Sequence, residues 1–281
     1  MLTTSSQGRS GAGGPQDERP AAITLSGVSV RYRMPTERIN TLKEQVIRTI
    51  TRRATGYREF WALRNITLRI EPGQSVALVG RNGAGKSTLL KVVARVVRPT
   101  AGRVVVRGSM AAMIELGAGF HPELTGRENI FLNGAMLGYS EQQMRRKFDS
   151  IVDFSELEAF IDSPLRTYSS GMQARLGFAV VAEVDPELLI VDEVLAVGDE
   201  AFQKKCTDRM RGFRRRGTTL LYVSHSLDHV HELCDEAVWI EEGRALFRGP
   251  AREVVTMFRE SMEFDTSIAV TQKRQVVRMS R

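Results

Sequence analysis

The sequence predicts an α/β domain with a largely parallel sheet, and three observations support this fold class. Residues 75–79, 188–191 and 219–223 are short apolar runs of the kind found in strands that are buried on both faces. The first run feeds a glycine-rich loop that fits the pattern G-x-x-x-x-G-K-[ST], namely Gly80-Arg81-Asn82-Gly83-Ala84-Gly85-Lys86-Ser87. The second run ends in two carboxylates, Asp192 and Glu193. Together these features predict a nucleotide-binding core.

Two strands and a tail are expected before the glycine loop. Residues 1–20 are polar and glycine-rich, which is typical of a flexible tail. Residues 23–32 alternate apolar and polar side chains and predict a strand. A second strand is expected at 65–70, before the turn Glu71-Pro72-Gly73, and a helix at 87–97, directly after the loop.

After that helix the pattern changes to short strands and then to helices. Residues 122–165 are predicted to be mostly helical, because their apolar positions are periodic and β-branched runs are few. The turn Glu241-Glu242-Gly243 predicts a hairpin, and a last helix is expected at 251–262 before a short basic tail at 263–281. The expected strands lie at 103–106, 110–114, 237–240 and 244–247.

Residues 34–56 form an unusual insertion between the first two strands. Four apolar side chains recur there at helical spacing, with basic side chains between them: Ile39, Leu42, Val46 and Ile50, then Lys43, Arg48, Arg52 and Arg53. An amphipathic helix of this kind belongs at a membrane interface or against a partner protein. The alternative is a surface helix that packs on its own domain.

Composition and charge narrow the class of protein. The 281 residues are 42% hydrophobic and 26% charged, which is ordinary for a soluble globular protein, and the apolar runs are too short to span a bilayer. With two cysteines and no apolar leader, we expect a protein of the cytoplasm. The net charge of +7 is concentrated in residues 31–60 and 261–281. Such basic surface suits anionic lipid heads or phosphates, nucleic acid is the rival, and a solvated face without a partner is the third alternative.

The glycine loop and the acidic strand end predict a site for a nucleoside triphosphate. Backbone N–H groups of such a loop wrap the phosphates, and the following helix adds its positive end. Lys86 supplies a point charge, and Ser87 supplies a hydroxyl ligand for Mg2+. Asp192 is placed to hold Mg2+, while Glu193 projects differently and is the candidate general base.

A third motif narrows the family. Tyr168-Ser169-Ser170-Gly171-Met172 lies between the loop and the acidic strand, where it predicts a turn that opens a helix. Over residues 21–262 the chain resembles the ATP-binding-cassette (ABC) family, whose signature this motif matches at Ser169 and Gly171. The resemblance implies a phosphate-loop ATPase core with an antiparallel β subdomain and a helical subdomain, here at 116–170. It also implies that two chains sandwich two ATP molecules head to tail, with Ser169 and Gly171 against the partner's ATP.

The resemblance carries further roles onto single residues. Asp199 matches the loop at the dimer seam, His225 the γ-phosphate-sensing histidine, and Tyr32 the aromatic that stacks on adenine, with Tyr57 and Phe60 as competitors. The family's glutamine loop falls near 114–122, where this chain has no glutamine and Glu115 is the candidate for its place. The catalytic candidates are Glu193, His225 and Lys86. The cofactor-binding candidates are Gly80, Asn82, Gly83, Gly85, Lys86, Ser87, Thr88, Tyr32, Ser169, Gly171, Glu115 and Asp199. The candidate ligands of Mg2+ are Ser87, Asp192 and Glu115.

The departures from the family pattern point to one branch. Residues 115–129, 168–172 and 192–199 together resemble the polysaccharide-export ATPases, which move O-antigen, teichoic acid or galactan, and the insertion at 34–56 fits that branch. Its members place an extra helix near the membrane, where the lipid-linked glycan enters. Only about thirty residues follow Pro250, too few for an appended sandwich domain of roughly a hundred. We therefore expect the shorter type of subunit, and galactan is the leading guess for the glycan.

The resemblance also implies partners. We expect a homodimer on the cytoplasmic face of the inner membrane that docks a membrane permease near Phe120–Leu124 and meets the membrane surface near residues 38–53. No nucleic-acid partner is expected. A chromosome-maintenance ATPase needs a long coiled coil between its phosphate loop and its signature, and here only about eighty residues separate Lys86 from Ser169. An importer ATPase is the main alternative, although it usually has the loop glutamine and lacks the insertion. A regulatory cassette without activity would be expected to lose Lys86 or Glu193.

Overall fold

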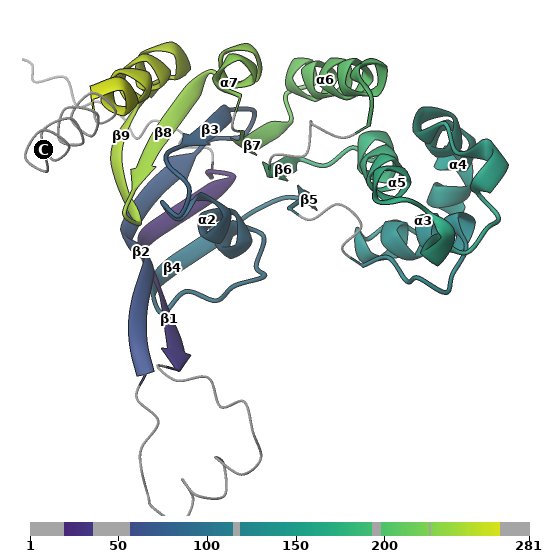
Figure 1. Cartoon of the computed structure of the whole chain (residues 1–281), viewed down its shortest axis with the longest axis horizontal. Helices are drawn as coiled ribbons and strands as arrows, with labels where there is room; N and C mark the ends of the chain where they lie inside the picture. Colours follow the sequence, from purple (N-terminus) through teal and green to yellow (C-terminus); the bar gives the residue numbers. More distant parts are fainter. Residues whose placement is uncertain (1–19, 36–56, 115–118, 193–197, 225, 265–281) are drawn as a thin grey trace, which may run out of the picture.

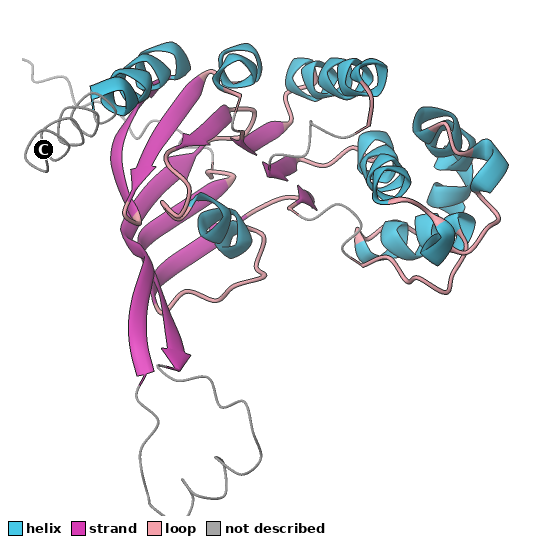
Figure 2. Cartoon of the chain, viewed as in Figure 1, coloured by secondary structure: helices cyan, strands magenta, loops and turns pink. Residues whose placement is uncertain are grey.

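Two sheets and a layer of helices make up the described part of the chain, as Figures 1 and 2 show for the computed structural model. The structure describes residues 20–35, 57–114, 119–192, 198–224 and 226–264. Within these ranges a three-stranded sheet and a six-stranded sheet lie on either side of one short helix, α2.

The smaller sheet is antiparallel. Its central strand is β1 (Ile23–Pro35), which pairs with β2 (Tyr57–Ile70) on one side and β4 (Ala101–Val106) on the other. The far ends of β1 and β2 form a long two-stranded extension, which Figure 1 shows projecting beyond the rest of the sheet.

The larger sheet has the strand order β5-β6-β7-β3-β8-β9, and its first five strands are parallel. β9 closes one edge as the antiparallel partner of β8. β3 and β7 are buried along their whole length because helices cover one face and α2 covers the other, which explains their unbroken apolar sequence. The strands are β3 (Ser75–Val79), β5 (Met110–Met113), β6 (Leu188–Asp192), β7 (Thr219–Val223), β8 (Glu236–Glu241) and β9 (Arg244–Pro250).

Two of the three hydrophobic cores flank the larger sheet. On one face α2 (Lys86–Val93) joins the two sheets through Leu89, Leu90 and Val93. On the other face lie α5 (Ser170–Glu183), α6 (Glu200–Arg215), α7 (Leu227–Leu233) and a helix at 251–264.

The third core holds a helical group at the far end of the molecule (Figure 1). It consists of α3 (Gly126–Met136) and α4 (Glu141–Ser155) packed against α5, with 3-10 turns at Glu158–Phe160 and Leu165–Thr167. Both α3 and α4 begin with a capping box, in which the N-cap side chain and the third helical side chain bond each other's backbone N–H. α5 takes part in two cores, because Phe178 packs toward the large sheet and Leu176 toward α3 and α4.

The predicted α/β fold with parallel central strands is confirmed, and several element boundaries are corrected. The first two strands are longer than expected, so Tyr57 and Phe60 lie within β2 rather than before it. The helix predicted at 87–97 ends at Val93, since Arg95 adopts a left-handed conformation with φ 63°. Residues 34 and 35 belong to β1, and the rest of the predicted amphipathic helix lies outside the described residues.

Candidate functional site

The glycine loop connects β3 to α2, as its sequence predicts. Gly85 caps the helix with φ 108°, and a Cβ there would lie 2.5 Å from the carbonyl oxygen of Ala62 and 3.0 Å from a methyl of Leu63. Only glycine therefore fits where the loop passes β2. The Lys86 side chain is buried and curls back along the loop, with Nζ 2.6 Å from the Gly80 carbonyl and 3.0 Å from the Arg81 carbonyl. An ammonium held at the centre of the loop is positioned to bind an anion that enters it.

A pocket of about 420 Å3 opens beside this loop. Tyr32 and Phe60 form its other wall, and they are directly opposite residues of β1 and β2. Because paired residues of neighbouring strands face the same side of a sheet, the two rings share one surface. They are 38% and 46% exposed, so a planar ligand can reach them. Seven of the predicted residues line this pocket together: Tyr32, Asn82, Gly83, Gly85, Lys86, Ser87 and Thr88.

The predicted acidic site lies at the end of β6. Asp192 is half-buried and is opposite Val223, the last residue of β7. Ser224 and Gly80 line a second cavity of about 410 Å3 beside the first residues of the glycine loop, together with Phe258 and Met262 of the 251–264 helix. Glu115, Glu193 and His225 lie outside the described residues.

Tyr168–Met172, here called the signature turn, opens α5 at a different place from the pocket. Ser169 is the N-cap of α5, and its Oγ accepts a hydrogen bond from the Met172 backbone N–H at 3.2 Å. A hydroxyl that accepts one bond still carries its own proton to donate. Ser169 and Gly171 are exposed, and among the described residues a Cβ on Gly171 would meet nothing closer than Ser169 Oγ at 3.8 Å. Packing within the described part of the chain therefore does not require glycine at position 171.

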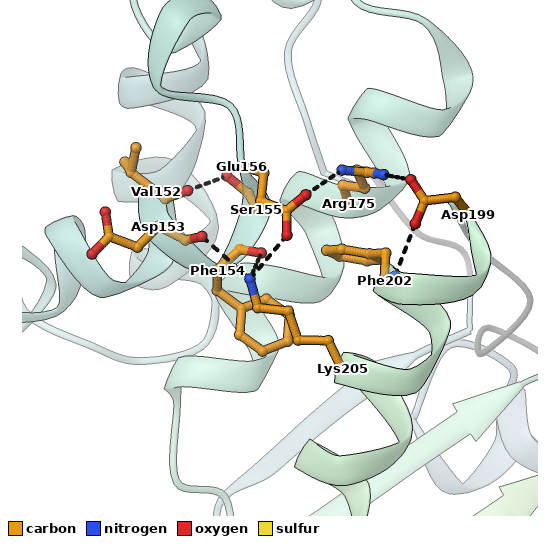
Figure 3. A network of polar contacts seen from close by, with 9 residues as sticks. All are labelled: Val152, Asp153, Phe154, Ser155, Glu156, Arg175, Asp199, Phe202 and Lys205. Carbon is orange, nitrogen blue, oxygen red and sulfur yellow. Dashed lines mark hydrogen bonds and ion pairs between the residues drawn. The ribbon is translucent and has the colours of Figure 1, made fainter.

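Asp199 belongs to a polar network that joins three helices (Figure 3). Asp199 caps α6 by accepting from the Phe202 N–H at 2.9 Å, and Arg175 of α5 donates to its other oxygen at 2.6 Å. The same guanidinium pairs with Glu156 at the end of α4 and lies over the Phe202 ring at 4.7 Å. The Phe202 amide, with Arg175, holds the pKa of Asp199 below its ordinary value.

Lys205 completes this network from α6. Its ammonium donates to Glu156 at 3.2 Å and to the Phe154 carbonyl at 2.9 Å. Sequence reasoning missed Arg175, and the one available signal was its place a single helical turn after Gly171. The network connects the helix that carries the signature turn to the helix that follows the acidic strand.

Comparison with known proteins fits this arrangement. A family model described as "ABC transporter" matches residues 63–196. The O-antigen export system ATP-binding protein RfbB of Klebsiella pneumoniae is 49% identical over 205 residues, which cover 73% of this chain and 83% of that protein.

The chain belongs to the ABC transporter family.

Two further relatives of this ABC protein match over more of its length. RfbB of Myxococcus xanthus, also an O-antigen export system ATP-binding protein, is 45% identical over 86% of this chain and 56% of its own length. The teichoic acids export ATP-binding protein TagH of Bacillus anthracis is 36% identical over 90% of this chain and 45% of its own.

Solved structures agree on the ABC ATPase fold. The dimeric post-hydrolysis state of the ATP-binding cassette MJ0796, bound to ADP and Pi, superposes with a TM-score of 0.65 at 20% identity and covers 82% of this chain and 98% of that one. A structure of the ATP-binding subunit of an ABC transporter gives a TM-score of 0.66 at 22% identity, over 84% and 93%. The antiparallel sheet, the six-stranded sheet and the helical group are thus parts of one cassette.

Proposed function

We propose that this chain is the ATP-hydrolysing subunit of an exporter that moves a lipid-linked polysaccharide across the cytoplasmic membrane. The observation that carries the proposal is the match to an O-antigen export ATP-binding protein at 49% identity over 83% of that protein. The teichoic acid export relative, similar over 90% of this chain, supports the same class of cargo. Galactan, O-antigen and teichoic acid are the glycans to be distinguished.

In the proposed site, ATP lies along the pocket between the sheet and the glycine loop. Its adenine stacks on Tyr32 and Phe60, since base–aromatic stacking contributes about 1–3 kcal/mol per base. Its phosphates take the place at Lys86 that the carbonyls of Gly80 and Arg81 now share. Ser87 and Asp192 offer the hydroxyl and carboxylate oxygens that suit Mg2+. When bound there, Mg2+ would neutralise charge on the β- and γ-phosphates.

Hydrolysis is assigned by resemblance to residues near the carboxyl ends of β6 and β7. Glu193 follows Asp192 and would act as general base toward the attacking water, and His225 would contact the γ-phosphate. Glu115 remains the proposed replacement for the loop glutamine. All three lie outside the described residues, so their roles stay proposals.

The proposed working unit is a head-to-tail homodimer. Gly171 is exposed, and the described residues of its own chain leave room for a Cβ, so the need for glycine would come from a second molecule. A signature turn placed against the partner's ATP supplies that need, because its helix N-terminus and the Ser169 hydroxyl face an anion. The dimeric ABC cassette in complex with ADP and Pi supports this assembly.

The subunit is proposed to work on the cytoplasmic face of the membrane with a permease. None of the described helices is both long and apolar enough to cross a membrane. The proposed permease contact is the docking segment, Phe120–Leu124, beside α3. The proposed membrane contact at residues 38–53 lies outside the described residues.

Depletion of the chain in its source cells tests the function. The lipid-linked glycan should then accumulate on the cytoplasmic side, because ATP no longer drives its export. Wild-type protein should restore export, whereas Lys86→Ala, made to the same level, should not. Mass spectrometry of the accumulated lipid identifies the glycan, and Tyr57→Ala, outside the pocket, serves as a matched variant that should restore export. Unchanged surface glycan after depletion would contradict the proposal.

A further inference from the structure

The segment that leads into the signature turn lies against the end of the docking segment and the residues that follow it. Backbone hydrogen bonds join residues 122–127 to 161–166, and we call this pair the ribbon. Leu165 N–H donates to Leu124 at 2.8 Å, and Arg166 N–H to Pro122 at 2.9 Å. In the opposite direction Gly126 and Arg127 donate to Ser163 and Ile161, at 3.2 and 2.8 Å. Thr125 and Pro164 form an antiparallel bridge between them.

Side chains reinforce both sides of the ribbon. Arg127 binds Asp162 through two nitrogens, at 2.7 and 3.2 Å, and this pair lowers the pKa of Asp162. Asn129, which is fully buried, accepts from the His121 N–H at 2.7 Å and donates to the carbonyls of His121, Leu124 and Thr125. The buried Asn129 side chain therefore holds the turn at 121–125 in one conformation.

Tyr168, the first residue of the signature turn, closes the ribbon. It is 6% exposed, and its hydroxyl donates to the Phe160 carbonyl at 2.7 Å. A Cβ on Gly126 would lie 2.3 Å from that hydroxyl and 3.0 Å from the Ile161 carbonyl. The phenol thus occupies the space that any other residue at position 126 would need, and the ring cannot swing aside without breaking its bond and leaving the core.

We infer that Tyr168 is a positioning residue whose phenol, seated on Gly126, locks the signature turn to the docking segment so that both move as one body. The inference rests on the proposed function, in which Phe120–Leu124 contacts the permease and Ser169 acts on the partner's ATP. It explains why Gly126 and Tyr168 are needed together: the phenol fills the space that the absent side chain of Gly126 leaves. A displacement at the docking segment then reaches Ser169 through four backbone bonds and one buried ring.

Four variants of the full chain test the lock. Gly126→Ala forces its Cβ against the phenol, so we expect kcat for ATP hydrolysis to fall at least about fivefold. The dissociation constant for ATP, measured by equilibrium binding, should stay within about twofold, because the glycine loop is remote. Tyr168→Phe removes the hydroxyl that the new Cβ meets, so the double variant should recover to within about twofold of Tyr168→Phe alone. Gly134→Ala is the matched control, because Gly134 lies in the same helix as Gly126 and its new Cβ would lie 2.4 Å from Met144 of α4 without touching the ribbon.

Hydrogen exchange separates the lock from the proposed function. The amides of Gly126, Arg127, Leu165 and Arg166 should exchange faster in Gly126→Ala and regain protection in the double variant, whatever the chain transports. Protection that follows this pattern together with kcat supports the inference. Three results would overturn it: equal loss of kcat in Gly126→Ala and Gly134→Ala, a double variant no faster than Gly126→Ala, or restored protection without restored kcat.

Discussion

The pairing register of β1 and β2 places Tyr32 and Phe60 side by side. Each is an exposed aromatic beside a glycine-rich loop, and the pairing of β1 with β2 makes them one two-ring surface. Tyr57, three residues before Phe60 on the same strand, points to the opposite face because side chains alternate along a strand. From the sequence alone, Tyr32, Tyr57 and Phe60 remained competing candidates. Which residue of β2 lies opposite Tyr32 depends on the pairing register, and the sequences of the two strands do not determine that register across the long connection between them.

Removing either pocket ring should weaken nucleotide binding. Tyr32→Ala or Phe60→Ala should raise the dissociation constant for ATP about thirtyfold, which is the middle of the range expected for one lost stacking contact. Isothermal titration with ATP measures the effect, and GTP should be affected to a similar degree because stacking tolerates any base. Tyr57→Ala is the control and should bind like the wild type. An equal loss in all three variants would instead indicate general disruption of the projecting end of β1 and β2.

Buried elements are the ones that the sequence predicts well. The strands β3, β6 and β7 are predicted to within a residue, because a short, unbroken apolar run is typical of a strand that is covered on both faces. β2 was predicted too short, since its first residues are exposed on both faces and show no buried period. The end of α2 was predicted too late because Arg95 adopts the left-handed conformation there. Glycine is the usual sign of such a helix end in a sequence, and arginine is not.

Contacts between helices were the part of the site that sequence could not give. Arg175 meets Glu156 and Asp199, which lie 19 and 24 positions away in the chain. Whether these charges meet depends on how α4, α5 and α6 pack against one another. The third core and the core beside the large sheet determine that packing. The signature turn, by contrast, was predicted correctly as the start of a helix because Ser169 is a strong N-cap residue.

The network around Arg175 should stabilise the junction of these three helices. Arg175→Ala removes two ion pairs and the stacking on Phe202, so we expect the melting temperature to fall by about 2–5 °C. Arg145→Ala is the matched control, since its side chain is 70% exposed, pairs with Glu141 within one helix and has its guanidinium 5.8 Å from the centre of the Phe131 ring. Differential scanning calorimetry should show little change for that control. An equally small change for Arg175→Ala would show that the network contributes nothing beyond a surface ion pair.

The stabilisation that this network provides depends on pH, and the direction of the change follows from the pKa of Asp199. Its folded pKa lies below the ordinary value, so the charged carboxylate stabilises the folded chain above that ordinary value. The stabilisation is lost as pH falls through the folded pKa. The difference in unfolding free energy between wild type and Asp199→Asn should therefore be constant near neutral pH and shrink in acid. Urea titrations at several pH values measure this, and a difference that grows toward acid would contradict the assignment.

At the scale of the whole molecule, stability and assembly place opposite demands on Gly171. The residue lies in the first turn of α5, where alanine is favoured over glycine by roughly 0.5–1 kcal/mol. Of the residues that the structure describes, a Cβ there would meet only Ser169, at 3.8 Å from its Oγ. Gly171→Ala should therefore leave the monomer as stable as the wild type or slightly more stable. If the signature turn closes on a partner's ATP, the same methyl group would occupy space that the nucleotide needs, and closure should be lost.

This opposition gives a test of the dimer that does not depend on the permease. Glu193→Gln should retain ATP and accumulate as a closed dimer, because the nucleotide is bound but its hydrolysis lacks the base. Adding Gly171→Ala to that variant should weaken ATP-dependent dimerisation at least about tenfold in sedimentation experiments, while calorimetry without nucleotide shows an unchanged or higher melting temperature. Ser170→Ala is the matched control on the neighbouring residue. Loss of monomer stability together with dimerisation would mean that Gly171 serves the fold of this chain, whereas dimerisation unaffected by the methyl group would remove the signature turn from the interface.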